Sequence, residues 1–197
     1  MKFLRLSTMV GAWIAAVALY STATSALAQE APRVKFATSA GEFVVELYPD
    51  KAPKTVENFL QYVKDKHYDG TIFHRVIDNF MVQGGGFDAK YTQKPTRAPI
   101  PLEASNGLKN NVGMIAMART SDPNSATSQF FINVKDNAML NAPSPDGHGY
   151  AVFGKVVSGA DVIQKIKTSA TGAAGPFASD VPKTTILINS ATLEKKS

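Results

Sequence analysis

The stretch Phe73-His-Arg-Val-Ile-Asp-Asn-Phe-Met-Val-Gln-Gly-Gly85 decides the fold, because two apolar runs in it are split by a short polar turn. Residues 71–77 and 80–83 have the aromatic and β-branched composition that is typical of strands. The following Gly84-Gly85-Gly86 is expected to end the second strand, because glycine weakens a regular strand. The segment therefore predicts two consecutive strands joined at Asp78-Asn79.

Polar side chains occur in these strands where a buried strand would normally stay apolar. Alternate residues of a strand point to the same face, so each strand is expected to present one long polar group beside one large apolar group. A third strand, over residues 128–134, repeats the pattern. Pairs expected to share a face are Phe73 with Arg75, Met81 with Gln83, and Gln129 with Phe131. Together they predict an apolar pocket rimmed by one arginine and two glutamines, a mixture common in ligand sites.

Helical periodicity occurs in two places. Pro53 suits a first helical turn, where its missing N–H costs nothing. Its helix carries an apolar stripe made of Val56, Phe59, Leu60 and Val63. Ser158, with Asp161 three residues later, is expected to cap a second helix. The buried face of that helix is Val162, Ile163 and Ile166.

Strands dominate the remainder of the chain. Five more are expected at 33–38, 42–48, 114–118, 150–157 and 184–193, which makes eight in all. Loops are expected at 88–112, 119–127 and 141–149. Mostly consecutive strands with two helices predict a mainly β fold, an eight-stranded antiparallel closed barrel with two capping α-helices.

Residues 1–28 have the pattern of a secretory signal peptide. Lys2 and Arg5 precede an uncharged, mostly apolar run over 9–20, and Ala26-Leu-Ala28 offers a cleavage site. A retained membrane anchor is the alternative, but a spanning helix needs about 20 apolar residues. We therefore expect residues 29–197 to form a single domain in the periplasm, with no membrane contact after cleavage.

Composition narrows the classes of partner and cofactor. The formal charge of +5 falls to +3 without Lys2 and Arg5, and no basic stretch is interleaved with aromatics, so we expect no nucleic-acid partner. The chain has no cysteine, and its three histidines, His67, His74 and His148, lack zinc-type spacing. We expect no metal and no cofactor, a structural role for His74, and a monomer. Ser128 has no plausible His–Asp partners, which disfavours a hydrolase.

Each candidate side chain also has a purely structural interpretation. Arg75 could be a structural cation paired with Asp78 or Glu103. Gln83 and Gln129 could make ordinary hydrogen bonds at a barrel rim. The apolar residues of the group, Phe80, Met81 and Phe131, could simply be core.

Taken together, four segments resemble the cyclophilin family of peptidyl-prolyl isomerases. The segments are Phe73–Gly85, Ser128–Ile132, Val152–Val156 and Pro53–Phe59, and the resemblance extends over about residues 33–193. It is greatest to the periplasmic bacterial members. It implies an eight-stranded barrel with a helix at each end. It also implies an isomerase that acts on X–Pro bonds of exported proteins, assists their folding and binds proline-containing polypeptides.

The resemblance also implies roles for individual residues. Arg75 corresponds to the catalytic arginine, and the proline pocket corresponds to Phe80, Met81, Phe131 and Leu140. Gln83 and Gln129 correspond to groups that hold the peptide backbone. The remaining substrate-binding positions are Ala118, Arg119 (in place of a more usual Asn), Met139 (in place of Trp) and Tyr150 (in place of His). The change at Met139 predicts weak cyclosporin binding.

Two further functions stay open at this point. A chaperone that binds proline-containing segments with little turnover would need the same groove. A barrel that binds an apolar small molecule inside would need an empty interior, whereas small barrels are usually filled by side chains.

Overall fold

The computed structural model describes residues 31–194, so the predicted signal peptide lies outside the described residues. The elements are β1 (Arg33–Thr38), β2 (Gly41–Leu47), α1 (Pro53–Lys64), β3 (Thr71–Ile77), β4 (Met81–Asp88), β5 (Met114–Met117), β6 (Phe130–Asn133), the 3-10 helix η1 (Ala138–Leu140), β7 (Val152–Ser158), α2 (Ala160–Lys167), β8 (Thr171–Ala174), β9 (Phe177–Pro182) and β10 (Ile188–Leu193). The predictions at 33–38 and 71–77 are confirmed to the residue, and Pro53 begins α1 as expected.

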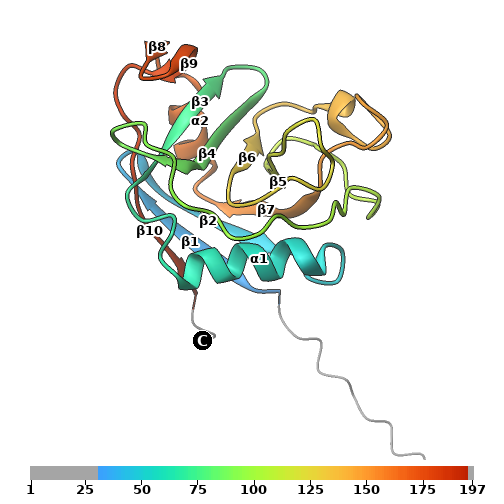
Figure 1. The fold of residues 1–197 in the computed structure, drawn as a ribbon. Coiled ribbons are helices and arrows are strands. Elements are labelled where there is room, and N and C mark those ends of the chain that lie inside the picture. Colours follow the sequence, from blue (N-terminus) through green and yellow to red (C-terminus); the bar gives the residue numbers. More distant parts are fainter. Residues whose placement is uncertain (1–30, 195–197) are drawn as a thin grey trace, which may run out of the picture.

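Eight strands form one antiparallel sheet that curves into a nearly closed barrel (Figure 1). Their order is β10-β1-β2-β7-β5-β6-β4-β3. The outer strands β3 and β10 meet through a bridge between Ile72 and Leu187, and the N–H groups of Gly70 and Phe73 donate to carbonyls of Ile188 and Ile186. The predicted mainly β barrel is confirmed, although its seam is held by fewer bonds than a full ladder.

Aromatic side chains fill the barrel interior. The rings of Phe36 and Phe43 stack with centroids 4.8 Å apart, and Phe59, Tyr68 and Phe130 pack around them. Alternation along β1 explains this, because every second residue of the strand is buried. Because side chains fill the interior in this way, the structure argues against a barrel that binds an apolar small molecule inside.

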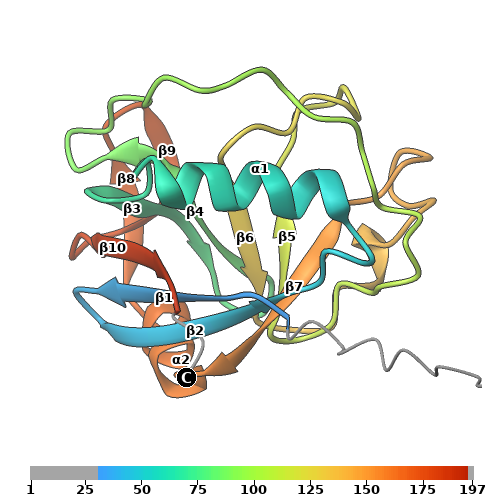
Figure 2. The same ribbon diagram turned by 90° about the horizontal axis from the view of Figure 1, so that it is seen from below.

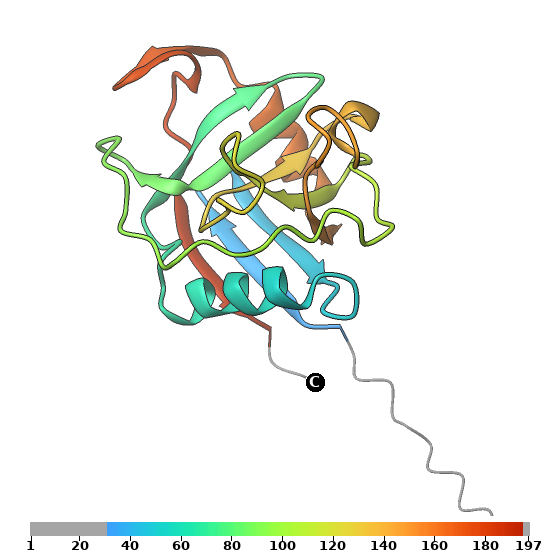
Figure 3. The same ribbon diagram turned by 45° about the vertical axis from the view of Figure 1, so that its right-hand side comes forward.

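The helices α1 and α2 lie on opposite sides of the barrel (Figure 2). Glu103 supports the start of α1, because its carboxylate accepts hydrogen bonds from the backbone N–H groups of Lys54 and Thr55. The segment between β4 and β5, which carries Glu103, therefore runs alongside α1 (Figures 2 and 3).

The predicted cap of α2 is wrong. Gly159 occupies the N-cap with φ of 77°, no side chain caps the helix, and Ser158 is the last residue of β7. A Cβ at position 159 would overlap the Glu42 carbonyl oxygen, so the close approach to β2 requires glycine.

Several boundaries differ from prediction. β4 continues through the three glycines to Asp88, η1 was not predicted, and β6 and β10 are shorter than expected. The hairpin β8–β9 was also missed, and it packs against β3. Small residues such as those of Thr171–Ala174 give no apolar alternation from which a strand could be predicted.

Candidate active site

A β-bulge turns Arg75 out of the barrel. Phe73 pairs with Gly84 and Arg75 pairs with Gln83, so β3 contains one residue more than β4 between these pairs. Phe73 is part of the barrel core, whereas Arg75 is only half-buried on the outer face. The expectation that Phe73 and Arg75 share a face is therefore wrong, because a bulge breaks the alternation. Bulges often re-aim a side chain in this way.

Three candidate residues, Arg75, Gln83 and Phe131, fall into one row across the outer surface of the sheet. Paired residues on neighbouring strands project from the same face, and the pairing runs from Arg75 to Gln83, Phe131, Ala116 and Val152. Five apolar residues form a second, smaller core here, namely Met81, Ala116, Phe131, Leu140 and Val152. Phe80, Ala118 and Tyr150 pack against it. Most of the predicted residues thus come together on one face, and Met81 with Gln83 share it as expected.

A chain of polar contacts links three of these side chains. The Nη1 of Arg75 donates to Oε1 of Gln83 at 3.4 Å, and Nε2 of Gln83 donates to Oε1 of Gln129 at 3.0 Å. The guanidinium carbon of Arg75 lies 5.9 Å from the centre of the Phe80 ring. This arrangement leaves a charged donor beside an apolar wall.

The structural interpretation of Arg75 as half of an ion pair is wrong. Asp78 pairs with Lys167 at 3.4 Å, and Glu103 is used at the start of α1. Between residues 31 and 194, no carboxylate lies within 4.0 Å of the Arg75 guanidinium nitrogens. The positive charge therefore remains available to a ligand.

Arg119 differs from the other candidates because its side chain is only 1% exposed. It forms an ion pair with Asp146 at 2.7 Å and donates to the carbonyl of Gly149 at 3.0 Å. Its guanidinium carbon also lies 4.4 Å from the centre of the Tyr150 ring. The side chain thus fastens the segment between η1 and β7 and presents almost no surface to a ligand. The Asp146 carboxyl, which accepts these bonds, has a pKa below its usual value.

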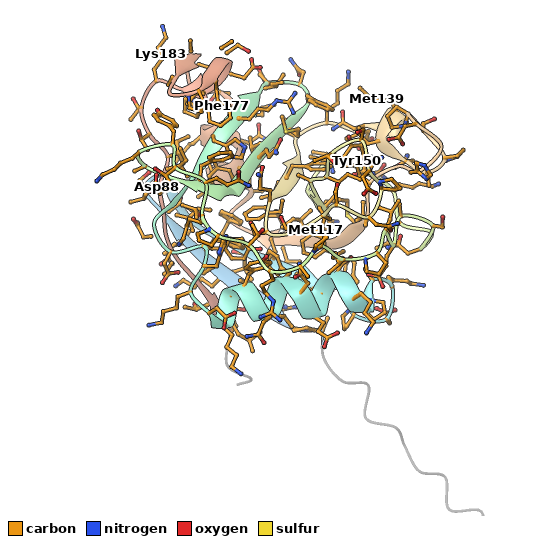
Figure 4. The ribbon with its side chains drawn as sticks, in the orientation of Figure 1. Asp88, Met117, Met139, Tyr150, Phe177 and Lys183 are labelled. Carbon is orange, nitrogen blue, oxygen red and sulfur yellow. The ribbon has the colours of Figure 1, made fainter. Side chains whose placement is uncertain are left out.

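The backbone N–H of Tyr150 donates to the carbonyl of Leu140, which follows Met139 in η1. Tyr150 and Met139 are both on the side of the molecule away from Phe177 (Figure 4). The Tyr150 ring meets the Phe131 ring edge-on, with centroids 5.7 Å apart. Met139 is 57% exposed, whereas its neighbour Leu140 is buried. Met139 can therefore make apolar contacts with a ligand, but it lacks the ring N–H donor that a tryptophan would provide at this position.

His74, the residue directly before Arg75, is buried, with 3% of its surface exposed. Its ring packs on Phe87 and Phe177, with centroids 4.7 and 5.4 Å away. Burial, and secondarily the positive charge of Arg75, lowers the pKa of His74 to about 4. The side chain is therefore neutral at physiological pH and forms part of an aromatic cluster, as a structural role requires.

Two further features of the site were not predicted from the sequence. Gly86 makes room for Gln129, because a Cβ at position 86 would overlap that side chain. Three buried asparagines, Asn110, Asn133 and Asn137, bond to one another behind the pocket. The signal that could have revealed them is Asn133 itself, a polar residue directly after the apolar run Phe130–Ile132.

Other kinds of site are not supported within the described range. Residues 31–194 contain no group of three His, Asp or Glu side chains arranged to hold a metal ion. No helix in this range is long and apolar enough to cross a membrane.

Comparison with known proteins points consistently to one family. The family description "cyclophilin type peptidyl-prolyl cis-trans isomerase" matches residues 33–193. The chain is 58% identical to peptidyl-prolyl cis-trans isomerase cyp18 of Streptomyces antibioticus over 81% of its own length and 97% of that protein. It is 53% identical to peptidyl-prolyl cis-trans isomerase B of Escherichia coli (strain K12), over 82% and 99% of the two chains.

A solved structure is similar as well. A Cryptosporidium parvum cyclophilin type peptidyl-prolyl cis-trans isomerase, crystallised in the presence of the dipeptide Ala-Pro, superimposes with a TM-score of 0.67 at 26% identity. The match covers 83% of this chain and 99% of that one.

Proposed function

The chain belongs to the cyclophilin-type peptidyl-prolyl cis-trans isomerases and catalyses rotation about X–Pro bonds, and we propose that Arg75 carries this catalysis. The supporting observation is the cross-strand row that places Arg75 beside Gln83 and in line with Phe131. Turnover of an Ala-Pro peptide by the wild type and by an Arg75→Ala variant tests this assignment.

The chemistry explains why an arginine suits the task. The barrier to peptide rotation is ~18–20 kcal/mol because the C–N bond has partial double-bond character. No bond is made or broken, so catalysis must stabilise the twisted state more than either planar one. In the twisted state the prolyl nitrogen regains a lone pair that can accept a hydrogen bond. A guanidinium is permanently charged and carries several donors, and an apolar wall strengthens its effect by excluding water.

The neighbouring residues bind the proline ring and the peptide backbone. The apolar wall comprises Phe80, Met81, Phe131 and Leu140. It holds the proline ring in place while the carbonyl group of the preceding residue rotates. Gln83 and Gln129 hold the peptide backbone, and the bond from Arg75 to Gln83 also orients the guanidinium. The backbone of Ala118 and Arg119 borders the same groove, with Met139 and Tyr150 at its rim.

The clients and compartment are part of the same proposal. Residues 1–28 have the features of a cleavable signal peptide, which supports a periplasmic enzyme that assists the folding of exported proteins. We propose that it acts there as a monomer on proline-containing polypeptides.

Gly86→Ala is expected to weaken peptide binding by about tenfold, equivalent to roughly 1.4 kcal/mol. The new methyl group displaces the Gln129 side chain, which then no longer accepts from Gln83. The matched control is Gly172→Ala, because its Cβ would meet only two carbons of the flexible Lys183 side chain, at 3.4 and 4.0 Å. Peptide titration followed by NMR measures both dissociation constants. If Gly86→Ala binds like the control, Gln129 does not hold the peptide.

Arg119→Ala is expected to raise KM by about tenfold, again roughly 1.4 kcal/mol, with a smaller change in kcat. The substitution frees the segment that carries Asp146 and removes the cation from the Tyr150 ring, so one edge of the groove loses its support. Asp146→Asn, which breaks the same ion pair from its other side, should shift KM in the same direction. Unchanged KM in both variants would show that the ion pair does not shape the groove.

A further inference from the structure

Three buried asparagines form one connected network behind the proline pocket. Asn110 lies before β5, Asn133 ends β6 and Asn137 precedes η1, and at most 1% of each residue is exposed. Nδ2 of Asn137 donates to Oδ1 of Asn133 at 2.8 Å, and Nδ2 of Asn133 donates to Oδ1 of Asn110 at 3.2 Å. We call these residues the asparagine triad.

The triad bonds to the main chain of three pocket residues. Nδ2 of Asn137 donates to the carbonyl oxygen of Phe80 at 2.8 Å. Nδ2 of Asn110 donates to the carbonyl oxygen of Leu140 at 3.1 Å and to that of Tyr150 at 3.4 Å. These bonds reach three separate parts of the pocket wall.

These three pocket residues do not lie on neighbouring strands that are hydrogen-bonded to one another. Phe80 lies in the turn between β3 and β4, Leu140 ends η1, and Tyr150 precedes β7. Backbone bonds join Leu140 to Tyr150 and Val134 to Phe80, but none joins Phe80 to the other two pocket residues within the described chain. The triad therefore supplies a hydrogen-bonded side-chain connection between the two halves of the wall.

A purely structural role accounts poorly for the triad. Buried amides are costly unless all their polar atoms are paired. Asn137 Oδ1 is buried and has no hydrogen-bond partner among residues 31–194. A buried polar group left unpaired in this way calls for an explanation other than stability. The bond from Nδ2 of the same side chain to the Phe80 carbonyl suggests one.

We propose that the asparagine triad is a positioning network that sets the spacing between Phe80 on one wall and Leu140 with Tyr150 on the other. The inference rests on the proposed function, because it assigns the triad to the proposed proline pocket. The walls contact the proline ring in the ground state and in the twisted state alike. Loosening them therefore raises the peptide dissociation constant and KM more than it lowers kcat.

The test compares Asn137→Ala with Thr71→Val in the full mature chain. Asn137→Ala removes two side-chain hydrogen bonds. Thr71→Val removes one, from the Thr71 hydroxyl to the carbonyl of Tyr68, which is part of the barrel core and not of the pocket. NMR titration with a short Ala-Pro peptide gives the dissociation constant, and turnover gives kcat and KM. Asn137→Ala should bind the peptide at least fivefold more weakly, with kcat changed less than KM, while Thr71→Val stays within twofold of the wild type.

Asn137→Ser replaces the amide donor with a hydroxyl donor and provides a milder variant should Asn137→Ala fail to fold. Its expected dissociation constant lies between those of the wild type and of the alanine variant, and at least twofold above the wild type. Wild-type affinity in a folded variant at position 137, or equal weakening by Thr71→Val, overturns the positioning role. Peptide binding by the wild type that leaves Phe131 unshifted overturns the proposed pocket as well, so the two failures are distinguishable.

Discussion

Arg75→Ala is expected to lower kcat/KM for a short Ala-Pro peptide by about 100-fold or more. This is the size of loss that follows removal of one preorganised donor from a developing charge. The variant should fold, because Arg75 is only half-buried and forms no ion pair among the described residues. A protease-coupled assay measures turnover, and circular dichroism checks the fold.

Two controls sharpen this experiment. Arg97→Ala removes an equally large cation, but Arg97 is exposed and its partner is Asp65, so turnover should be unchanged. Arg75→Lys keeps the charge but loses the planar set of donors, so it should recover only part of the activity. If a folded Arg75→Ala retains near-full turnover, the assigned role is wrong.

The same variant addresses the chaperone alternative. Isomerase activity and client binding should both depend on the groove, but only isomerase activity should depend strongly on Arg75. If the loss of turnover leaves the suppression of client aggregation unchanged, binding is a separate contribution of this protein.

The second large effect concerns acid stability. The free energy of unfolding is expected to fall by about 3 kcal/mol between pH 6.5 and pH 4 through His74 alone. The pKa of His74 is depressed to about 4 in the folded protein, so the unfolded chain binds the proton first as pH falls. Stability from this group is therefore complete above the unfolded value of 6.5 and is lost as pH falls toward 4. Denaturant titrations across that range measure the effect.

His74→Phe is the matched variant. A phenyl ring can occupy the space between Phe87 and Phe177 without a titrating group, so the loss of stability on acidification should be markedly smaller. Some loss will remain, because burial also lowers the pKa of His67. Parallel pH curves for His74→Phe and the wild type would contradict this account.

Sequence alone predicts the barrel because its periodicities are strong. The alternation at 33–38 and the stripe that follows Pro53 reflect burial on one face, and the structure confirms both elements. The bulge before Arg75 could not be predicted in this way, because a bulge depends on the pairing with β4 and not on β3 alone. The continuation of β4 through Gly84–Gly86 could not be predicted from the local sequence either. Neighbouring atoms approach these positions so closely that glycine fits where a larger residue would not.

The residues of the candidate site could be identified from the sequence, but not all of the contacts that they make could be predicted. Resemblance to a family identifies Arg75 and Phe131 by position, and the pairing of β3, β4 and β6 brings them to one face. Arg119 shows the limit. Its side chain turns inward because Asp146 and Gly149, some thirty residues later, provide acceptors that no local pattern links to it.

Equilibrium exchange NMR on an Ala-Pro peptide bound to the wild type and to Arg75→Ala tests the central claim most directly. The experiment separates capture of the peptide from interconversion of its isomers. We expect both proteins to bind the peptide with dissociation constants of the same order, and only the wild type to interconvert cis and trans peptide rapidly while bound. Equally fast interconversion on both proteins would contradict the account.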